Sequence, residues 1–287
     1  MKQKQWKIIT KYCIICIMMV CIYSGKVQAA NPSRVSLEPG VLYSSYDITG
    51  DGVPDKIDIV TYSSGKYEKD ELKIYVNDKI AYQIKNKFFS SITMELCTLQ
   101  NGKVYIYLYA AWDDDNGPVC GMFQYENGTL KKVFDFQTFY KYGRNNFGTI
   151  MKVSENSIKV NLFSMSWIMG PLEMQYILKV KKGRLCVDSN KGKVMSTVLR
   201  FQNKSYFTSA YAIKVYKNAV NSKKKFTLKK GDKVKITACY VNKSNIRFQI
   251  KTKGGKTGWI KSPKKYLHKD TKNGYIDGYF KESYYAG

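Results

Sequence analysis

The chain has 287 residues, and its 48 Lys and Arg against 22 Asp and Glu give a formal net charge of +26. Charge of this sign attracts polyanions, although a lysine-rich soluble surface has the same composition. The seven cysteines are too few for a disulfide scaffold in a chain of this length.

The first 29 residues follow the three-part plan of a secretory signal peptide. A basic start, MKQKQWKIITK, precedes a short apolar run at 12–23, and Val27 and Ala29 occupy the small-residue positions before a cleavage point. The alternative is an uncleaved membrane anchor. However, a segment that spans a bilayer needs about 20 apolar residues, and this run is shorter. We expect cleavage near Ala29, no transmembrane segment afterwards, and a secreted or cell-wall-associated, extracellular protein.

The mature chain reads as strands throughout. Tyrosine, which favours half-buried sheet faces, occurs 24 times in the 287-residue chain. Pairs such as Asn127-Gly128 between alternating runs are typical of hairpins, because both turn residues must tolerate positive φ. The runs with strand character lie at 56–62, 72–77, 103–112, 121–126, 130–136, 157–163 and 173–182. The expected fold of residues 30–205 is an antiparallel meander or a partial, propeller-like sheet.

Near the start of this region, oxygen-bearing residues alternate along one short loop. Asp47, Thr49, Asp51 and Asp55 stand at positions 1, 3, 5 and 9, and the carbonyl of Val53 stands at position 7. Alternate side chains of a tight loop can converge on one hard cation, and this spacing is the one calcium loops use. We expect one structural Ca²⁺ at these five residues. The alternative is an Asp/Gly-rich turn without metal.

The context of the loop separates two kinds of calcium site. An EF-hand would continue into a helix with Glu at position 12, whereas position 12 is Asp58 within the strand-like run at 56–62. The loop instead resembles the calcium loop of FG-GAP and integrin-type β-propeller repeats, which enters a strand. Thr49 stands where that family usually has Asn.

A second acidic segment, Asp113 to Asp115, does not repeat this spacing. Three adjacent strand residues cannot all converge, so a hairpin turn is favoured, with an auxiliary cation or ligand contact as the alternative. His268 is the only histidine, and no Ser or Cys has a base at a readable spacing. These observations predict a protein that is not an enzyme.

Four cysteines remain after the signal peptide. They fit neither a zinc knuckle nor a redox CxxC pair, and they fall inside strand-like runs. Buried free thiols are expected, and one disulfide bridge is the open alternative for an exported chain. The residues are Cys97, Cys120, Cys186 and Cys239.

Residues 206–268 contain about five short strands in the order and spacing of a small β-unit. The corner Leu228…Gly231-Asp232…Val234 and the strand Gly258-Trp259-Ile260 resemble a bacterial SH3-like domain, which implies a small barrel. Its penultimate strand here reads NIRFQIK. The tail 269–287 is rich in aromatic residues, and we expect part of it to pack on a neighbouring unit.

The basic charge is concentrated at the C-terminal end. Residues 206–287 hold 20 Lys and Arg against 4 Asp and Glu, a net of +16, whereas residues 30–205 have a net of +5. This asymmetry favours an anionic partner outside the cell, and no nucleic-acid motif accompanies it. The candidate ligand-binding residues are Lys223, Lys224, Lys225, Lys229, Lys230, Tyr240, Trp259 and Tyr266.

Together, the signal, the calcium-type loop and the SH3-like segment resemble exported proteins of Gram-positive, clostridia-like bacteria. This resemblance implies a secreted, non-catalytic binding protein whose partner is an anionic cell-wall polymer or peptidoglycan. We expect a monomer. Two alternatives stay open, namely a peptidoglycan or glycan hydrolase with an unrecognised site and an extracellular accessory factor that binds a protein.

Overall fold

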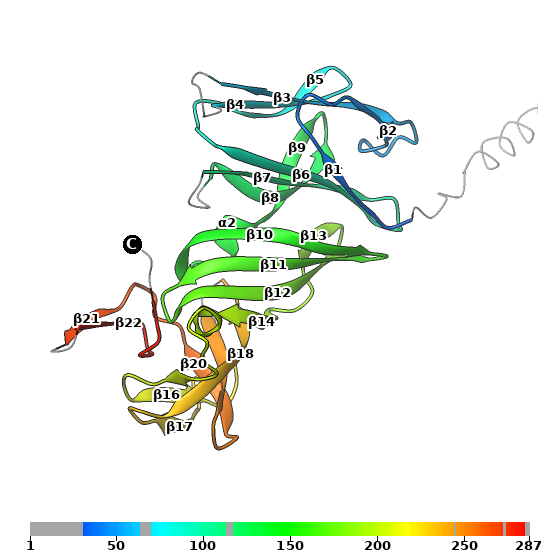
Figure 1. Cartoon of the computed structure of the whole chain (residues 1–287). Helices are drawn as coiled ribbons and strands as arrows, with labels where there is room; N and C mark the ends of the chain where they lie inside the picture. The colour runs from blue at the N-terminus through cyan, green and yellow to red at the C-terminus, as the bar shows by residue number, and fades with distance from the viewer. Residues whose placement is uncertain (1–30, 64–69, 113–116, 244, 272–273, 285–287) are drawn as a thin grey trace, which may run out of the picture.

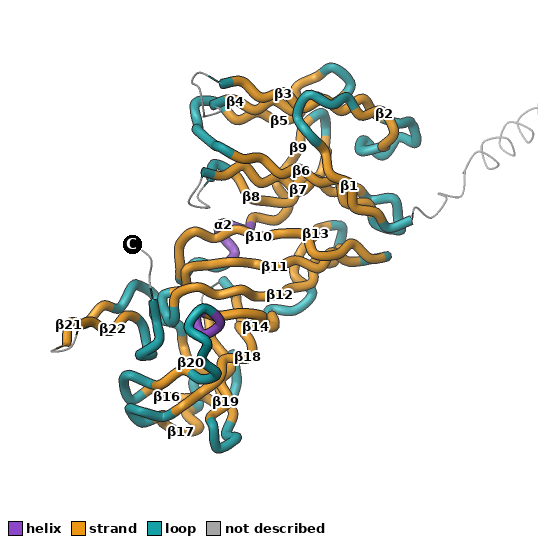
Figure 2. Tube along the Cα trace, in the orientation of Figure 1, coloured by secondary structure: helices purple, strands orange, loops and turns teal. Residues whose placement is uncertain are grey.

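The computed structural model describes residues 31–63, 70–112, 117–243, 245–271 and 274–284. Within these ranges the chain is all-β and antiparallel, which confirms the predicted fold class. Figure 2 shows strands throughout, with α2 as a short helix between β9 and β10. The predicted signal peptide at 1–29 and the aspartates at 113–115 lie outside the described residues.

The first nine strands form two antiparallel sheets that face each other (Figure 1). One sheet has the order β2-β3-β4-β5, and the other has the order β1-β6-β7-β8-β9. Aliphatic side chains from both sheets make one core between them. The strands are β1 (Ser33–Leu37), β2 (Tyr43–Tyr46), β3 (Asp55–Tyr62), β4 (Glu71–Val76), β5 (Lys79–Ile84), β6 (Ser91–Thr98), β7 (Val104–Ala111), β8 (Val119–Glu126) and β9 (Thr129–Asp135).

The second of these sheets is covered on both faces. Along β7, Ile106 and Leu108 belong to the core shared with β2–β5, whereas Tyr105 and Tyr107 belong to a second core on the other side. The hydroxyl of Tyr107 donates to the carbonyl of Gly148 on β10. Burial on both faces explains why the sequence of β7 is a continuous apolar and aromatic run.

The remaining strands, apart from a C-terminal hairpin, form one eleven-stranded sheet. Its main order is β10-β11-β12-β14-β18-β19-β20-β16-β17, with β13 paired to β12 and β15 paired to β18. Its elements and the two short helices are α2 (Phe136–Phe139), β10 (Gly143–Ser154), β11 (Ser157–Ser166), β12 (Gly170–Lys181), β13 (Arg184–Val187), β14 (Lys191–Thr197), η1 (Val198–Arg200), β15 (Phe207–Thr208), β16 (Ile213–Tyr216), β17 (Lys224–Leu228), β18 (Lys233–Val241), β19 (Ile246–Thr252) and β20 (Thr257–Lys261).

The boundary predicted at 205/206 lies between η1 and β15, and the sheet continues across it. β14 pairs with β18 through Lys191–Lys193 and Ala238–Tyr240. Buried residues on both sides of the boundary, from Leu162 to Ile250, belong to one core. Strand pairing and a shared core therefore join the residues on the two sides of this boundary. Within the described residues, the pairing order begins at β10 and ends at β17, and it is that of an open sheet.

The C-terminal tail packs on the large sheet. It forms a hairpin of β21 (His268–Thr271) and β22 (Gly274–Asp277) and then runs back along the body (Figure 1). Phe280 is fully buried, with its ring centroid 4.8 Å from that of Phe207. The carboxylate of Glu282 accepts bonds from the N–H (2.6 Å) and hydroxyl (2.9 Å) of Thr208. These contacts fasten the tail beside β15.

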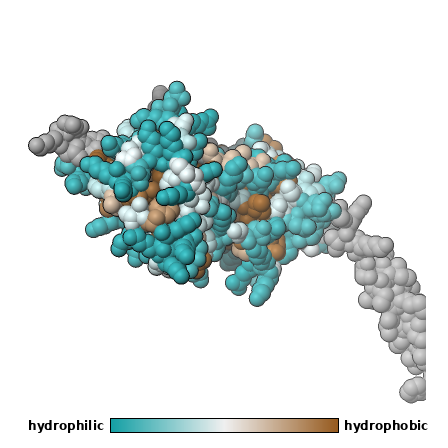
Figure 3. All heavy atoms as spheres, turned by 90° about the horizontal axis from the view of Figure 1, so that it is seen from below, coloured by the Kyte–Doolittle hydropathy of each residue, from teal (hydrophilic) through white to brown (hydrophobic). Residues whose placement is uncertain are grey.

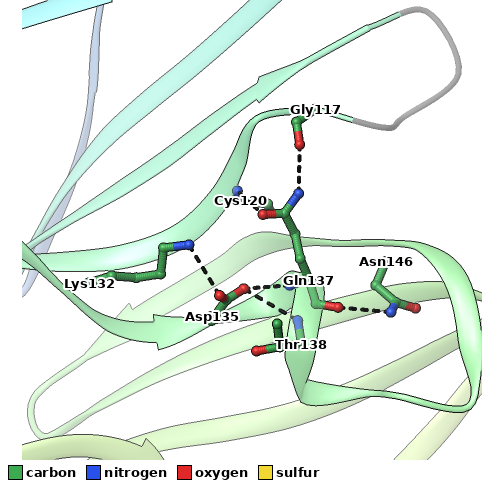
Figure 4. A network of polar contacts seen from close by, with 7 residues as sticks. All are labelled: Gly117, Cys120, Lys132, Asp135, Gln137, Thr138 and Asn146. Atoms are coloured by element: carbon green, nitrogen blue, oxygen red, sulfur yellow. Dashed lines mark hydrogen bonds and ion pairs between the residues drawn. The ribbon is translucent and has the colours of Figure 1, made fainter. Parts of the chain in front are cut away.

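A polar network lies where the N-terminal sheets meet β10 (Figure 4). Asp135 caps α2 by accepting the N–H of Gln137 (2.9 Å), and it also pairs with the ammonium of Lys132 (3.1 Å). The side-chain amide of Gln137 donates to the carbonyl of Gly117 (2.7 Å), and the backbone carbonyl of Gln137 accepts from the side-chain amide of Asn146 (2.9 Å). The network joins β8, β9 and β10 around one short helix.

The four cysteines of the described residues are free thiols, as predicted. Cys97, Cys120 and Cys239 are buried, and Cys186 is half-buried. Burial raises the pKa of Cys97 and of Cys120 to about 12, and it also raises the pKa of Cys239. These three thiols therefore stay protonated at neutral pH and pack as small apolar side chains.

Candidate functional sites

The aspartate loop connects β2 to β3, and backbone N–H groups of the loop donate to the carboxylate of its first residue, Asp47. Oδ1 of Asp47 accepts the N–H of Gly50 (2.6 Å), and Oδ2 accepts the N–H of Gly52 (2.8 Å). Bonds from a short acidic side chain to the backbone a few residues on are typical of tight turns. The hydroxyl of Thr49 also donates to Oδ1 of Asp47 (3.4 Å). Asp47 therefore organises the outer half of the loop.

Asp55 fixes the loop to the sheet. Its carboxylate is buried at the start of β3, where Oδ2 accepts the N–H groups of Ile48 (2.7 Å) and Thr49 (2.9 Å). Oδ1 accepts the side-chain amide of Asn77 in the turn between β4 and β5 (2.6 Å). Three donors thus satisfy this buried charge, and the loop is pinned by hydrogen bonds from the protein itself.

The three carboxylates of the loop do not converge into one ligand set. Asp55 points at the protein's own N–H groups, whereas Asp51 is exposed and accepts the N–H of Val53 (2.8 Å). Throughout the described ranges, no group of three or more His, Cys, Asp and Glu side chains is placed to hold a metal ion. Calcium takes six to eight oxygen ligands. The residues therefore do not fit a complete calcium site in this conformation, and calcium binding stays a prediction.

The five predicted lysines are exposed but do not form one patch. Lys223, Lys224 and Lys225 lie at one end of β17, and Lys229 and Lys230 lie beyond its other end. Lys224 and Lys225 are the first two residues of β17, so three residues separate the two groups, and Lys225 lies about 13 Å from Lys229 along an extended strand. The surface seen from below in Figure 3 is mostly hydrophilic, in keeping with such lysine-rich turns.

The predicted aromatic residues divide between two places. Tyr240 and Trp259 lie edge to face with ring centroids 6.4 Å apart, and the ammonium of Lys191 lies 5.6 Å from the Trp259 ring. Trp259 is only 7% exposed, so its main role is packing. Tyr266 lies elsewhere, against Trp167. The structure therefore does not bring the three aromatic residues together as one platform.

One arginine is buried, which the sequence alone did not predict. Arg247 on β19 is 1% exposed, and its guanidinium donates to the carbonyls of Asn218 (3.1 Å) and Asn221. Its Cζ lies 4.7 Å from the ring of Tyr216, and burial lowers its pKa. Arg247 therefore fixes the loop before β17. The one signal in the sequence is a charge inside the apolar run NIRFQIK.

The single histidine belongs to an ordered pair rather than to a loose loop. Nδ1 of His268 lies 2.9 Å from Oδ1 of Asp277, which also accepts the hydroxyl of Tyr266 (2.6 Å). Asp277 is buried, and Nε2 of His268 lies 3.2 Å from Oδ1 of the exposed Asp270. The hydrogen bond to Asp277, followed by that to Asp270, raises the pKa of His268 above its ordinary 6.5. The sequence hid this pair, because Asp277 lies nine residues away.

This pair predicts a measurable titration. In proton NMR, the single imidazole should titrate above pH 6.5, because both carboxylates favour its protonated form. Asp277→Asn should lower this pKa more than Asp270→Asn does. A folded-state pKa above the unfolded value stabilises the fold fully below pH 6.5, and that stabilisation is lost as pH rises through the folded pKa. An imidazole that titrates at or below 6.5 in the wild type would contradict the pairing.

A groove lies beside this pair. Its volume is about 640 Å³, and it runs between β16, the end of β20 and the base of the β21–β22 hairpin. The residues that line it are Tyr211, Ala212, Ile213, Lys214, Tyr216, Lys261, Leu267, His268, Lys269 and Tyr279. Of the eight residues predicted to bind a ligand, none lines this groove, although Tyr266 reaches its neighbour His268 with ring centroids 6.1 Å apart.

Comparison with known proteins gives no family for this chain. No protein-family model matches it, and neither a curated protein nor a solved structure matches it. Among the described residues, no helix is long and apolar enough to cross a membrane.

Proposed function

We propose that this chain is a secreted, non-catalytic protein that binds an anionic polymer of the cell wall through its C-terminal part. The observation that carries the proposal is the net charge of +16 over residues 206–287, most of it on lysines. Their ammonium groups are exposed, as at Lys223, Lys224, Lys229 and Lys230. Exposed lysines attract a long polyanion, and the attraction increases with the number of lysines that contact it.

Two resemblances support this proposal at the level of the fold. Strands β16–β20 form a contiguous five-stranded part of the large sheet, and the turn before β18 is closed by Oδ2 of Asp232, which accepts the N–H of Lys229 (2.7 Å). This arrangement supports an SH3-like unit at 206–268. Four consecutive strands, β2–β5, follow one another in a meander around the aspartate loop, which supports the likeness to FG-GAP repeats.

One observation favours the alternative of a hydrolase. His268 and the buried Asp277 have the geometry of a base held by a carboxylate. The described residues that line the neighbouring groove include no Ser, Thr or Cys to act as a nucleophile. We therefore keep the non-catalytic function as the conclusion and the hydrolase as the second candidate. A protein-binding accessory role has no observation of its own.

One experiment separates these functions. The full mature chain, residues 30–287, is incubated with labelled cell walls that have or lack teichoic acid, at low and high salt. We expect sedimentation with the walls at low salt, loss of binding as salt screens the lysines, and no release of soluble label. Binding that survives both teichoic-acid removal and high salt would indicate peptidoglycan as the ligand. Soluble fragments would instead establish the hydrolase.

Calcium binding at Asp47, Thr49, Asp51, Val53 and Asp55 is a separate proposal. It rests on the spacing of these residues, and it requires Asp55 to exchange hydrogen-bond donors for the ion. Calorimetry should then show binding with a dissociation constant of about 10⁻⁴ to 10⁻³ M, as in extracellular modules. The melting temperature should rise with calcium and fall with EDTA. Absence of heat together with an unchanged melting temperature would refute the site.

A further inference from the structure

The groove beside His268 is rich in lysines that have no carboxylate partner among the described residues. Lys214 on β16, Lys261 at the end of β20 and Lys269 on β21 all line it, and none of them takes part in an ion pair with another described residue. All three are exposed. Lysines from three separate elements thus line one groove. Lysines that only keep a surface soluble have no reason to gather in this way.

Tyrosine rings alternate with these lysines. The ammonium of Lys261 lies 5.3 Å from the ring centroid of Tyr216, and that of Lys269 lies 6.0 Å from the ring centroid of Tyr211. These contacts place two of the cations over ring faces. The rings also offer apolar area to the uncharged part of a ligand. The groove therefore has both a charged and an apolar component.

The wall of the groove is held in place by the backbone. At the base of the hairpin, the N–H of Gly278 donates to the carbonyl of Leu267 (2.9 Å), and the N–H of Tyr279 donates to that of Ile168 (3.1 Å). Gly278 has φ +68, and a Cβ there would lie 2.5 Å from the carbonyl oxygen of Ile168. Only glycine fits this close approach, so the hairpin meets the large sheet at a fixed position.

The cations in the groove suit a ligand that carries separate negative charges. They are lysine and histidine side chains, without an arginine among the described lining residues. Lysine binds phosphate as a point charge, whereas arginine binds carboxylate and phosphate alike with two parallel hydrogen bonds. His268 adds a further charge when protonated, held on its inner side by Asp277. A chain of phosphodiesters joined by short polyols carries single negative charges at intervals, and the C–H groups between them can pack on tyrosine rings, so it matches this pattern.

We propose that the groove lined by Lys214, Lys261, Lys269, His268, Tyr211 and Tyr216 is the site where the chain binds a phosphodiester polymer, such as a polyol phosphate. The lysines contact successive phosphates, and the tyrosines pack on the polyol between them. This inference rests on the proposed function and names its binding site. The polymer binds in the groove formed with the C-terminal hairpin, and the lysines around β17 contribute less.

The test measures binding of a fluorescent poly(glycerol phosphate) oligomer to the full mature chain by anisotropy at several salt concentrations. The triple variant K214Q/K261Q/K269Q should weaken binding at least about tenfold. It should also reduce the salt dependence, because fewer counterions leave the polymer when fewer lysines contact its phosphates. The same positions changed to arginine should restore binding. Circular dichroism confirms that each variant is folded.

Two further triples have the same change in net charge. K79Q/K85Q/K87Q removes exposed lysines next to β5 and should bind as the wild type does. K223Q/K224Q/K229Q removes the lysines around β17, and it should weaken binding less than the groove triple does. A groove triple that binds like the wild type, or that loses no more than the K223Q/K224Q/K229Q triple, would overturn the groove as the site while leaving wall binding intact.

Unlabelled competitors test the chemistry of the ligand. The phosphate oligomer should displace the probe, whereas glycerol phosphate monomer and a carboxylate polymer such as polygalacturonate should displace it weakly. Equal displacement by the carboxylate polymer would overturn the preference for phosphate. Wild-type protein that binds neither the oligomer nor teichoic-acid-bearing walls would overturn both the groove and the proposed function. Wild-type protein that binds walls but not the oligomer would overturn the groove proposal alone.

Discussion

Replacing Phe280 by alanine should cost about 3 to 5 kcal/mol of unfolding free energy, which is the largest single-residue loss we expect. The ring is fully buried and packs on Phe207, which lies in the same core as the strands on both sides of residue 205. The cavity would open where the tail crosses back onto the sheet. In urea, the midpoint should fall in a single transition, because the strands before and after this point share one core.

Tyr284 provides the matched control for this variant. It lies in the same tail but its side chain is 52% exposed, so Tyr284→Ala should change stability by less than about 0.5 kcal/mol. Phe280→Leu should fall between the two, because it retains part of the buried volume. A loss below about 1 kcal/mol for Phe280→Ala would show that the tail is not part of the core.

Asp55→Ala should be the second most damaging substitution and should act without any metal. It leaves the N–H groups of Ile48 and Thr49 and the amide of Asn77 without their acceptor. Unpaired buried donors cost about 1 to 3 kcal/mol each. Only the bond from Ile48 is fully buried and the other two are part-buried, so we take the lower end for all three, a total loss of about 3 kcal/mol and a melting temperature lower by about 6 to 12 °C. Thermal unfolding in EDTA is the measurement.

Asp51→Ala separates this structural role from calcium binding. Asp51 is exposed and accepts one bond within the loop, so its loss should change the melting temperature in EDTA by no more than about 2 °C. If calcium binds, the same variant should abolish the rise in melting temperature that calcium produces. If Asp55→Ala leaves the melting temperature unchanged in EDTA and lowers it only with calcium, Asp55 stabilises the protein through the ion.

Local patterns in the sequence predicted the strands and turns well. The run at 56–62 became β3, and the run at 130–136 became β9. Asn127 and Gly128 both have positive φ, and they join β8 to β9 as a hairpin turn. These features depend on a few neighbouring residues, namely side-chain alternation and the φ that a turn needs, so they can be read directly from the order of the residues.

Contacts between distant strands could not be predicted in this way. The pairing of β14 with β18 joins residues about fifty positions apart, and no periodicity specifies the partner of a strand. The same limit applies at the candidate sites. The spacing of the aspartates in the loop was visible in the sequence. The side-chain amide of Asn77, which donates to the carboxylate of Asp55, comes from another turn and was not. Likewise, the groove combines Lys214 with Lys269, which meet only because the hairpin returns to β16.

The sheet β1-β6-β7-β8-β9 has consequences for how a gene encoding this chain can be recombined. One of its faces belongs to the core with β2–β5, and the other contributes Tyr105 and Tyr107 to the core of the large sheet. A fragment that begins after β9 would expose an aromatic surface that this sheet normally covers. A fragment limited to residues 206–287 would also lose the partner strand of β18. Fusion proteins and transplanted binding units should therefore carry the ordered chain from β1 to the C-terminal tail as one segment.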